Sequence, residues 1–295
     1  MLEDMQNIFD QISPKNVILM THNHDALALI SCFIFNAERK YFIHHGDHHL
    51  CLGAASPEFL HIDLTNWSFH HCKDHIGLKS NYYLPLVVSD SFEFNYSDYS
   101  EEDISSQFIT CTSGRGSKFI SDDMPFGNMI AMIINTTNGS HLHIGELSAD
   151  QLTAIKSACE RLHINFNRFI HLQHTSSLSK IWILQRVKLY ISSFPIVGAK
   201  SNIEAMSLGL PIILFNNPFS RILSGIDFAY PEALSWSSPE ELFKILASLK
   251  ANPRALLESS TFSKAYYLKY HSAVYMGMNS PKFIGDLSTS YLPPL

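Results

Sequence analysis

The sequence is short of charge and of long hydrophobic runs. Only 16% of its 295 residues are charged and the net charge is −6. No basic stripe with interleaved aromatic residues occurs, so we expect no extended contact with nucleic acid. No apolar segment reaches about 18 uninterrupted residues, which predicts no membrane-spanning helix. The first ten residues, MLEDMQNIFD, are acidic where a signal peptide is basic. These absences favour a cytoplasmic protein, with peripheral membrane or partner-subunit association left open.

Cysteine is also sparse. No C-x-x-C pair occurs, and the cysteines are odd in number and widely spaced, so we expect reduced thiols in the core, at Cys32, Cys51, Cys72, Cys111 and Cys159. Apolar residues, in contrast, make up 46% of the chain. A chain of this length and composition buries a substantial core and suits about two domains of roughly 100–200 residues.

The most informative segment is YISSFPIVGAKSNIEAMSLGLPIILFN, residues 190–216. Residues 189–191 and 211–215 are short apolar runs bounded by turn residues, as in parallel strands that are covered on both faces. Between them, a small-residue loop leads into a helix. We expect this helix to begin around residues 200–202, to run through 203–208 and to end at Gly209.

The start of that helix has the chemistry of a phosphate site. Free backbone N–H groups and the positive end of the helix dipole attract phosphate. Ser201 and Asn202 add side-chain donors, Lys200 adds charge, and Glu204 is placed to accept hydrogen bonds from ribose hydroxyls. We therefore predict a nucleotide-binding unit. The alternative is an ordinary strand-helix-strand packing unit with a surface glutamate.

A second loop supports this prediction. Residues 108–111 form a strand-like run that leads into TSGRGSKF, residues 112–119. Glycine lets backbone amides approach a diphosphate, and Lys118 or Arg115 can neutralise it. The pattern G-x-x-x-x-G-K-[ST] is absent, so the loop is not a Walker loop. We expect Ser113 and Gly114 in the binding site, together with Lys118 or Arg115.

Helices and strands alternate between the two loops. We predict helices at 128–134, 149–162 and 177–185, and strands at 141–144 and 169–172. Such alternation implies a doubly wound α/β domain whose parallel sheet binds ligands at the carboxyl ends of its strands.

At these residues the chain resembles the nucleotide-sugar half of GT-B glycosyltransferases, in which a loop of small and hydroxyl residues precedes E-A-M-x-x-G-x-P. It is most similar to the group of O-GlcNAc transferase and the bacterial cytoplasmic N-glycosyltransferases, closely over roughly residues 105–245 and more loosely over 16–90. Lys200 and Asn202 stand where O-GlcNAc transferases carry a threonine and a glycine. The resemblance implies a GT-B-like α/β fold of two Rossmann-like domains facing a central cleft, the first one short.

The resemblance also implies an activity and a set of contacts. The activity is transfer of a sugar of the hexose type from a nucleotide-sugar donor, expected to be a UDP-sugar, to a glycan or protein acceptor in bacterial glycan biosynthesis. No D-x-D pair occurs to hold a divalent ion, so we expect no metal and no cofactor beyond the donor. The resemblance implies that Lys118, Ser201 and Asn202 contact the diphosphate and that Glu204 contacts the ribose. It also implies that Leu172 and His174 contact the base.

A polar, acidic stretch at residues 90–106 predicts the domain boundary, with domains at 1–103 and 104–295. The first domain has a strand-like run at 16–20, a helix-like run at 26–35 and a strand-like run at 40–43. Compared with the resembled enzymes, its opening strands are missing, so it is either minimal or completed by a partner. The resemblance implies that the C-terminal helix crosses back onto the first domain.

Sixteen histidines are a high number, and two groups of them follow apolar strands, in THNHDA and HHGDHH. Near neutral pH, histidine accepts a proton, donates one, or balances a diphosphate. We expect Asp47 or His45 to act as the base toward the acceptor. The resemblance implies that His44, His45 or His48 lies near the leaving diphosphate. The alternative is a hydrogen-bonded network that only fixes a loop.

Two other functions stay open. A metallohydrolase could use THNHDA, but after His22 and His24 the aspartate comes one position too early, and zinc needs three or four converging ligands. A non-catalytic GT-B-like protein that binds nucleotide or sugar, or scaffolds a transferase, is favoured by the short first domain. The combination of HHGDHH with Lys118 and Glu204 favours the enzyme.

Overall fold

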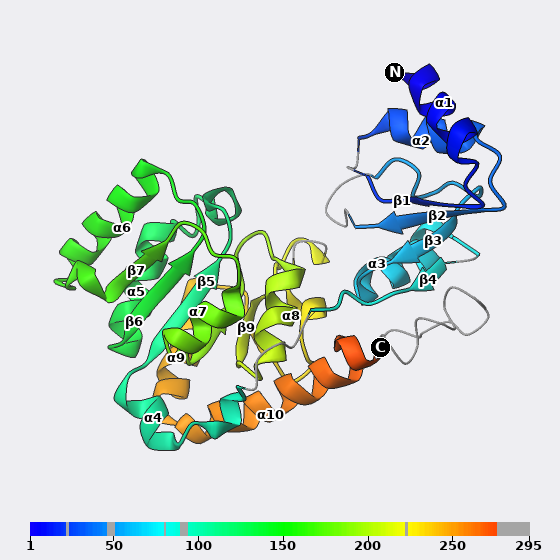
Figure 1. Ribbon diagram of the computed structural model, residues 1–295. Coiled ribbons are helices and arrows are strands. Elements are labelled where there is room, and N and C mark those ends of the chain that lie inside the picture. The colour runs from blue at the N-terminus through cyan, green and yellow to red at the C-terminus, as the bar shows by residue number, and fades with distance from the viewer. Residues whose placement is uncertain (22–23, 46–50, 80, 89–93, 222–223, 276–295) are drawn as a thin grey trace. The chain divides into compact units, whose positions relative to one another are not determined.

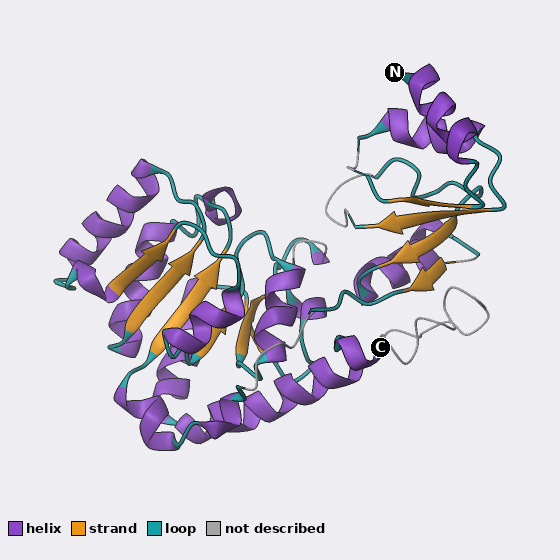
Figure 2. Cartoon of the chain, in the orientation of Figure 1, coloured by secondary structure: helices purple, strands orange, loops and turns teal. Residues whose placement is uncertain are grey.

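The computed structural model describes residues 1–21, 24–45, 51–79, 81–88, 94–221 and 224–275. The chain divides into two compact units, one formed by Met1–Leu86 and the other by Val87–Met276. Each unit contains one parallel β-sheet with helices packed around it (Figures 1 and 2). The predicted α/β class is confirmed.

The first unit has a four-stranded sheet in the order β1-β2-β3-β4, with every pair parallel. Each strand is followed by its neighbour in the same direction across the sheet. Because such crossovers are right-handed, the segments that connect the strands all lie on one face of the sheet. On that face Val17, Leu19 and Phe42 pack with Cys32 and Phe59. The elements are α1 (Leu2–Ile12), β1 (Asn16–Leu19), α2 (Ala26–Ile34), β2 (Arg39–His44), β3 (Leu60–Asp63), α3 (Asn66–His71), the π-helical turn η1 (Cys72–Ile76) and β4 (Asn81–Tyr83).

The second unit has a six-stranded parallel sheet in the order β10-β9-β8-β5-β6-β7. The chain starts in the middle at β5, moves outward to β7, returns to β8 beside β5, and moves outward the other way. Its elements are α4 (Glu101–Ser106), β5 (Ile109–Ser113), α5 (Phe126–Thr137), β6 (Ser140–Ile144), α6 (Ala149–Arg161), β7 (Phe169–Leu172), α7 (Leu178–Leu184), β8 (Leu189–Ile191), α8 (Ala199–Ser207), β9 (Ile212–Phe215), β10 (Leu234–Trp236), α9 (Pro239–Ala251) and α10 (Pro253–Tyr270).

This reversal of direction places two groups of helices on opposite faces of the second sheet, because each crossover is right-handed. Helices α5, α6 and α9 pack together, and α8 packs on α7 and α10. Strands β5, β8 and β9 are buried along their whole length, as expected of parallel strands covered on both faces. The strands and helices predicted between residues 108 and 215 are confirmed, with small differences at their ends.

The acidic stretch predicted to link two domains is part of the second unit from residue 94 onward. The division of the chain falls earlier, after Leu86. Tyr96 is fully buried and donates a hydrogen bond to the Lys188 carbonyl at 2.8 Å. The Lys188 ammonium lies 3.1 Å from the centre of the Tyr99 ring, and Arg186 pairs with Asp103 at 2.8 Å. Aromatic side chains spaced among the acidic residues therefore dock this stretch, although its composition is typical of a linker.

Two expectations from composition concern the whole chain. All five cysteines lie in the described ranges, where each is buried and none forms a disulfide. Among the described helices, none combines the length and the apolar character needed to cross a membrane. The return of the last helix to the first domain stays a prediction, while α10 packs on α8 and α4 of its own unit.

Candidate nucleotide-binding site

The two loops singled out in the sequence lie at the same place in the second sheet. Strands β5 and β8 are neighbours in the middle of that sheet and mark the point where strand order reverses. Open α/β sheets bind ligands outside the carboxyl ends of the strands at such a reversal. The loop 114–119 leaves β5 there, and the loop 192–198 leaves β8.

The Lys118 side chain reaches from the first loop to the second. It comes from the short 3-10 turn η3 (Gly116–Phe119). A Cβ atom built on Gly198 would lie 3.1 Å from Nζ of Lys118, 3.1 Å from Oγ of Ser201 and 3.6 Å from Oγ of Ser193. One ammonium group and two hydroxyl groups thus surround the glycine that precedes α8.

This group is electrostatically incomplete. Burial lowers the pKa of Lys118, and among the described residues no carboxylate lies within ion-pair distance of its ammonium. Gly198 is the N-cap of α8 and provides no side-chain cap, so the first-turn amides keep their donors available. A partly desolvated cation beside the positive end of a helix attracts an anion.

Two buried hydroxyl groups, from Ser113 of β5 and Tyr190 of β8, extend the site. Ser113 and Tyr190 hydrogen-bond through their hydroxyl groups at 2.7 Å, and both are buried. Burial raises the pKa of Tyr190, while hydrogen bonds with Ser113 and Ser201 oppose the rise. Glu204 is half-buried one turn into α8; burial raises its pKa and Lys200 lowers it. The structure therefore places the predicted residues Lys118 and Ser201 around Gly198 and links Ser113 to Ser201 through Tyr190, while Glu204 lies about one turn further along α8.

Helix α8 begins earlier than expected, which changes the placement of two predicted residues. It starts at Ala199, so residues 200–202 belong to its first turn and not to the loop before it. Lys200 is exposed, whereas Asn202 is fully buried and its amide has no hydrogen-bond partner among the described residues. The helical turn directs Ser201 toward Lys118 and Asn202 into the packed interior.

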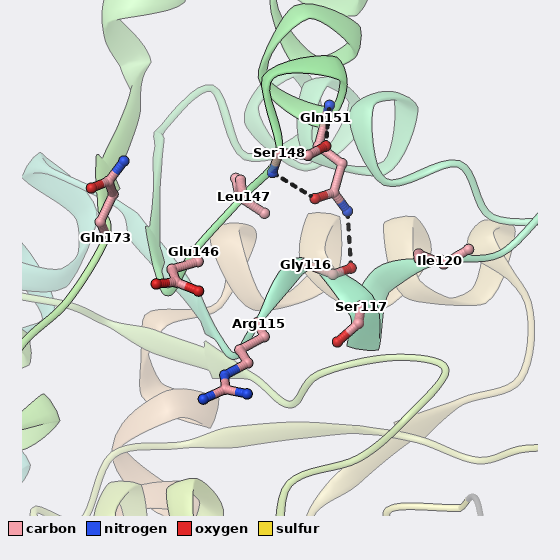
Figure 3. Close-up of a pocket in the computed structure, with 9 residues that line it drawn as sticks. All are labelled: Arg115, Gly116, Ser117, Ile120, Glu146, Leu147, Ser148, Gln151 and Gln173. Atoms are coloured by element: carbon pink, nitrogen blue, oxygen red, sulfur yellow. Dashed lines mark hydrogen bonds between the residues drawn. The ribbon is translucent and has the colours of Figure 1, made fainter.

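A pocket of about 640 Å³ opens beside the first loop, at the carboxyl ends of β5, β6 and β7 (Figure 3). Backbone bonds hold these ends together: the Gly114 N–H donates to the Ile144 carbonyl at 2.9 Å, and the Gly116 N–H to the Glu146 carbonyl at 2.7 Å. Gly114 and Gly145 both have a φ of +142°. A Cβ on Gly145 would lie 2.0 Å from the Gly114 carbonyl oxygen, so this close approach requires glycine.

Gln151 ties the pocket wall to helix α6. Its Nε2 donates to the Gly116 carbonyl at 2.9 Å, and its Oε1 accepts from the Ser148 N–H at 3.1 Å (Figure 3). Ser148 in turn caps α6 through the Gln151 N–H, which completes a capping box. The pattern S-x-x-Q before an apolar helix is a sequence signal that marks this residue pair.

The predicted base contacts Leu172 and His174 are not among the residues that line this pocket, whereas Gln173, which lies between them in the sequence, is. The Leu172 carbonyl already accepts a hydrogen bond from the Gly145 N–H at 2.8 Å, and His174 is exposed. Sequence reasoning did not single out Gln173 or Glu146 as pocket residues, because nothing in their spacing distinguishes them from other polar loop residues.

The two histidine groups singled out in the sequence belong to the first unit. His45 is exposed just after β2, and His44 is buried in a cluster with Asp63. Asp47 and His48 lie outside the described residues. Asp25 of THNHDA is the N-cap of α2 and accepts from the Ala28 N–H at 3.0 Å. That aspartate therefore has a structural role, which weakens the metallohydrolase hypothesis.

Comparisons with known proteins identify the fold. No protein-family model and no curated protein sequence matches the chain. Among solved structures, it is similar to a glycosyltransferase from Rickettsia africae, with a TM-score of 0.67 and 11% identity, covering 98% of this chain and 81% of that one. It is also similar to HepE of Anabaena in complex with UDP and glucose, with a TM-score of 0.65 and 12% identity, covering 96% and 80%.

A third similar structure is sucrose-phosphate synthase from Thermosynechococcus elongatus, with a TM-score of 0.69 and 10% identity, covering 97% of this chain and 77% of that one. These neighbours are GT-B glycosyltransferases. With its two parallel sheets, the chain has the GT-B fold, as the resemblance in its sequence implied.

Proposed function

We propose that the protein is a glycosyltransferase that binds a nucleotide sugar at the reversal point of its second sheet. The observation that carries the proposal is the position of Lys118. Its ammonium lies beside Gly198 at the uncapped start of α8, where the Ser201 hydroxyl also lies, and it has no carboxylate partner among the described residues. A diphosphate supplies the missing negative charge.

Structural likeness supports the same donor class. HepE has been crystallised with UDP and with UDP-glucose, and the protein shares its fold. We therefore assign a UDP-sugar as the donor, a hexosyl group as the group transferred, and a glycan or a protein as the acceptor.

Each part of the donor has a place in this assignment. Lys118, Ser193 and Ser201 bind the diphosphate, and Glu204 binds the ribose. The pocket beside Gln173 receives the base, next to the predicted contacts Leu172 and His174. Lys118 and the amides of α8 stabilise the leaving diphosphate without a catalytic metal. Asp47, His45 and His48 remain our candidates for the transfer chemistry.

Calorimetric titration of the full chain with UDP, GDP, dTDP and ADP tests the donor site. We expect one nucleotide to bind with micromolar affinity. Lys118→Ala removes a charge-assisted contact and is expected to weaken that binding about 10–100-fold, and Glu204→Ala about tenfold. The exposed residues Lys244 and Glu160 provide matched controls, and Lys244→Ala and Glu160→Ala are expected to leave affinity unchanged.

A second function, non-catalytic nucleotide binding, is favoured by the four-stranded first sheet, which runs in sequence order and has no reversal of its own. Release of UDP from UDP-sugars in the presence of candidate acceptors separates the two functions. Turnover abolished in Lys118→Ala supports the transferase. Nucleotide binding without turnover favours the binding protein, and absence of binding contradicts the donor site itself.

A further inference from the structure

Four side chains of metal-ligand type converge inside the first unit. They are His44 at the end of β2, His61 and Asp63 on β3, and Cys72 at the start of η1. One ligand atom from each lies within 4.8 Å of all the others, and all four residues are buried. None of them lies on the two loops of the second unit described above; His44 was expected near the leaving diphosphate, and Cys72 only as a core thiol.

The strand register explains why these residues meet. His44 and Asp63 are direct partners across the parallel pair β2 and β3, and His61 pairs with Phe42. Because side chains alternate between the faces of a strand, His61 and Asp63 share one face with Phe42 and His44. Phe42 belongs to the core cluster with Cys32 of α2, so this is the helix-covered face. Cys72 approaches it from the segment that follows α3.

Three of the six distances between the ligand atoms are close to those of a small tetrahedral centre. Nδ1 of His44 and Nε2 of His61 each lie 3.1 Å from Oδ1 of Asp63, and Sγ of Cys72 lies 3.4 Å from Nδ1 of His44. In tetrahedral zinc sites, bonds of about 2.0–2.3 Å separate neighbouring ligand atoms by about 3.3–3.6 Å. These three separations need to widen by at most a few tenths of an ångström, and the other three, all within 4.8 Å, need to close by at most about 1.5 Å to hold the ion.

Nδ1 of His44 is shared by two neighbours, the Asp63 carboxylate at 3.1 Å and the Cys72 sulfur at 3.4 Å. A metal ion among the atoms is attracted to the nitrogen, the carboxylate oxygen and the thiolate alike.

We propose that His44, His61, Asp63 and Cys72 bind one zinc ion with a structural role. Two imidazoles, one carboxylate and one thiolate form a mixed set of the kind that zinc accepts, and four protein ligands leave no open position for substrate. Binding releases the thiol proton of Cys72, and each neutral imidazole moves its proton to the nitrogen that does not ligate. The ion joins β2, β3 and η1 next to His45.

An outer contact supports the carboxylate in this role. Nδ2 of Asn81, at the start of β4, donates to Oδ2 of Asp63 at 3.1 Å and to the Phe69 carbonyl at 2.8 Å. This leaves Oδ1 directed at the two histidines. Ligating carboxylates are commonly oriented by such hydrogen bonds.

Metal analysis of the full chain tests the site. We expect protein purified without chelators to contain about one zinc per chain by inductively coupled plasma mass spectrometry. Cys72→Ser and Asp63→Asn are expected to lose most of it. Cys32→Ser is the matched control, because Cys32 is a buried cysteine of the same unit outside the cluster, and it should retain the zinc.

Cobalt substitution keeps the test decisive if those variants do not fold. The apo wild-type chain titrated with Co²⁺ should saturate at one equivalent, with intense tetrahedral d–d bands and a thiolate-to-cobalt charge-transfer band, and zinc should displace it. A wild-type chain that contains no stoichiometric metal and binds neither ion at one equivalent overturns the proposal. So does a Co²⁺ complex without a thiolate band, or a Cys72→Ser variant with full zinc content.

Discussion

Both sheets of this protein are parallel, but the polar groups at their strand ends differ in whether they have partners within the protein. In the second sheet, strand order reverses between β5 and β8, and Lys118 lies at the reversal with no carboxylate partner in the described structure. In the first sheet, strand order never reverses, and Asp63 accepts hydrogen bonds from two histidines and Asn81. The Lys118 ammonium is therefore left for a ligand to pair with, whereas the Asp63 carboxylate has its partners within the protein.

The difference teaches how topology separates a binding site from an internal site. At a reversal, two loops diverge and leave backbone amides exposed between them. In a sheet that runs in sequence order, polar residues at strand ends meet the next connection and become buried. Incomplete charge compensation therefore points to the nucleotide site, and complete compensation points to a structural role for the first cluster.

The largest expected effect that tests this comparison is acid sensitivity. Burial, with a smaller effect of His171, lowers the pKa of His143 to about 3, against about 6.5 in an unfolded chain. The neutral imidazole stabilises the fold fully above pH 6.5, and this contribution is lost as the pH falls toward 3. The pKa of Asp63 is also lowered, because bonds from His44 and His61 outweigh its burial, but its contribution persists down to about pH 4.

Hydrogen exchange measured by mass spectrometry between pH 7 and 4, corrected for intrinsic rates, distinguishes the two units. Peptides from β5 and β6, which depend on His143, should lose protection at a higher pH than peptides from β2 and β3, which depend on Asp63. His143→Gln, which keeps a polar partner for Thr112, should flatten this dependence. His163→Asn is the control, since His163 is exposed and its φ of 55° suits asparagine. An unchanged slope in His143→Gln would contradict the assignment.

Much of the second unit could be predicted from the sequence because its buried strands and capped helices give strong local signals. The strand at 189–191 was predicted from its apolar run, and the helix at 149–162 from its place in the alternation of strands and helices. Strand β10 and helix α4 were not predicted. Strand β10 has three residues, of which only Trp236 is buried, and α4 lies in the acidic stretch whose docking depends on distant partners.

The candidate sites show the same limit. Lys118, Ser201 and Glu204 were found because loop composition and helix position identify phosphate and ribose groups. Tyr190 was missed because a buried strand with no exposed residue has no alternation to show which side chain reaches the site. The cluster around Asp63 was missed because its members come from three elements and meet only through strand register, with His61-x-Asp63 as its one local signal.

A smaller effect is expected from adding a methyl group at the reversal point. Gly198 has a φ of −118°, which alanine tolerates, so Gly198→Ala acts on the space between Lys118 and Ser201 more than on the backbone. We expect nucleotide affinity to fall about tenfold, or about 1.4 kcal/mol, with little change in thermal unfolding. Calorimetry measures the affinity and circular dichroism the unfolding.

Gly225→Ala is the matched control for this variant. A Cβ there would meet Val197 at 3.2 Å and the Phe215 carbonyl at 3.3 Å, so it is equally crowded but touches no cation or hydroxyl group. Equal losses of affinity in both variants would attribute the effect to loop packing and would remove the distinction between an open polar site and its surroundings.

The smallest expected effect concerns the pocket wall beside that site. Gln151→Ala removes the bonds from Nε2 to the Gly116 carbonyl and from the Ser148 N–H to Oε1, and is expected to lower the free energy of unfolding by about 0.5–1.5 kcal/mol. Gln151→Glu keeps the acceptor of the capping box, places negative charge at the start of α6, and loses only the bond to Gly116. Urea unfolding of both variants, with nucleotide titration, separates the two contributions. If Gln151→Glu is as stable as the wild type but binds nucleotide as weakly as Gln151→Ala, the bond to Gly116 positions the loop that carries Lys118. If Gln151→Glu matches the wild type in both stability and affinity, Gln151 only caps the helix and the pocket wall is independent of the binding site.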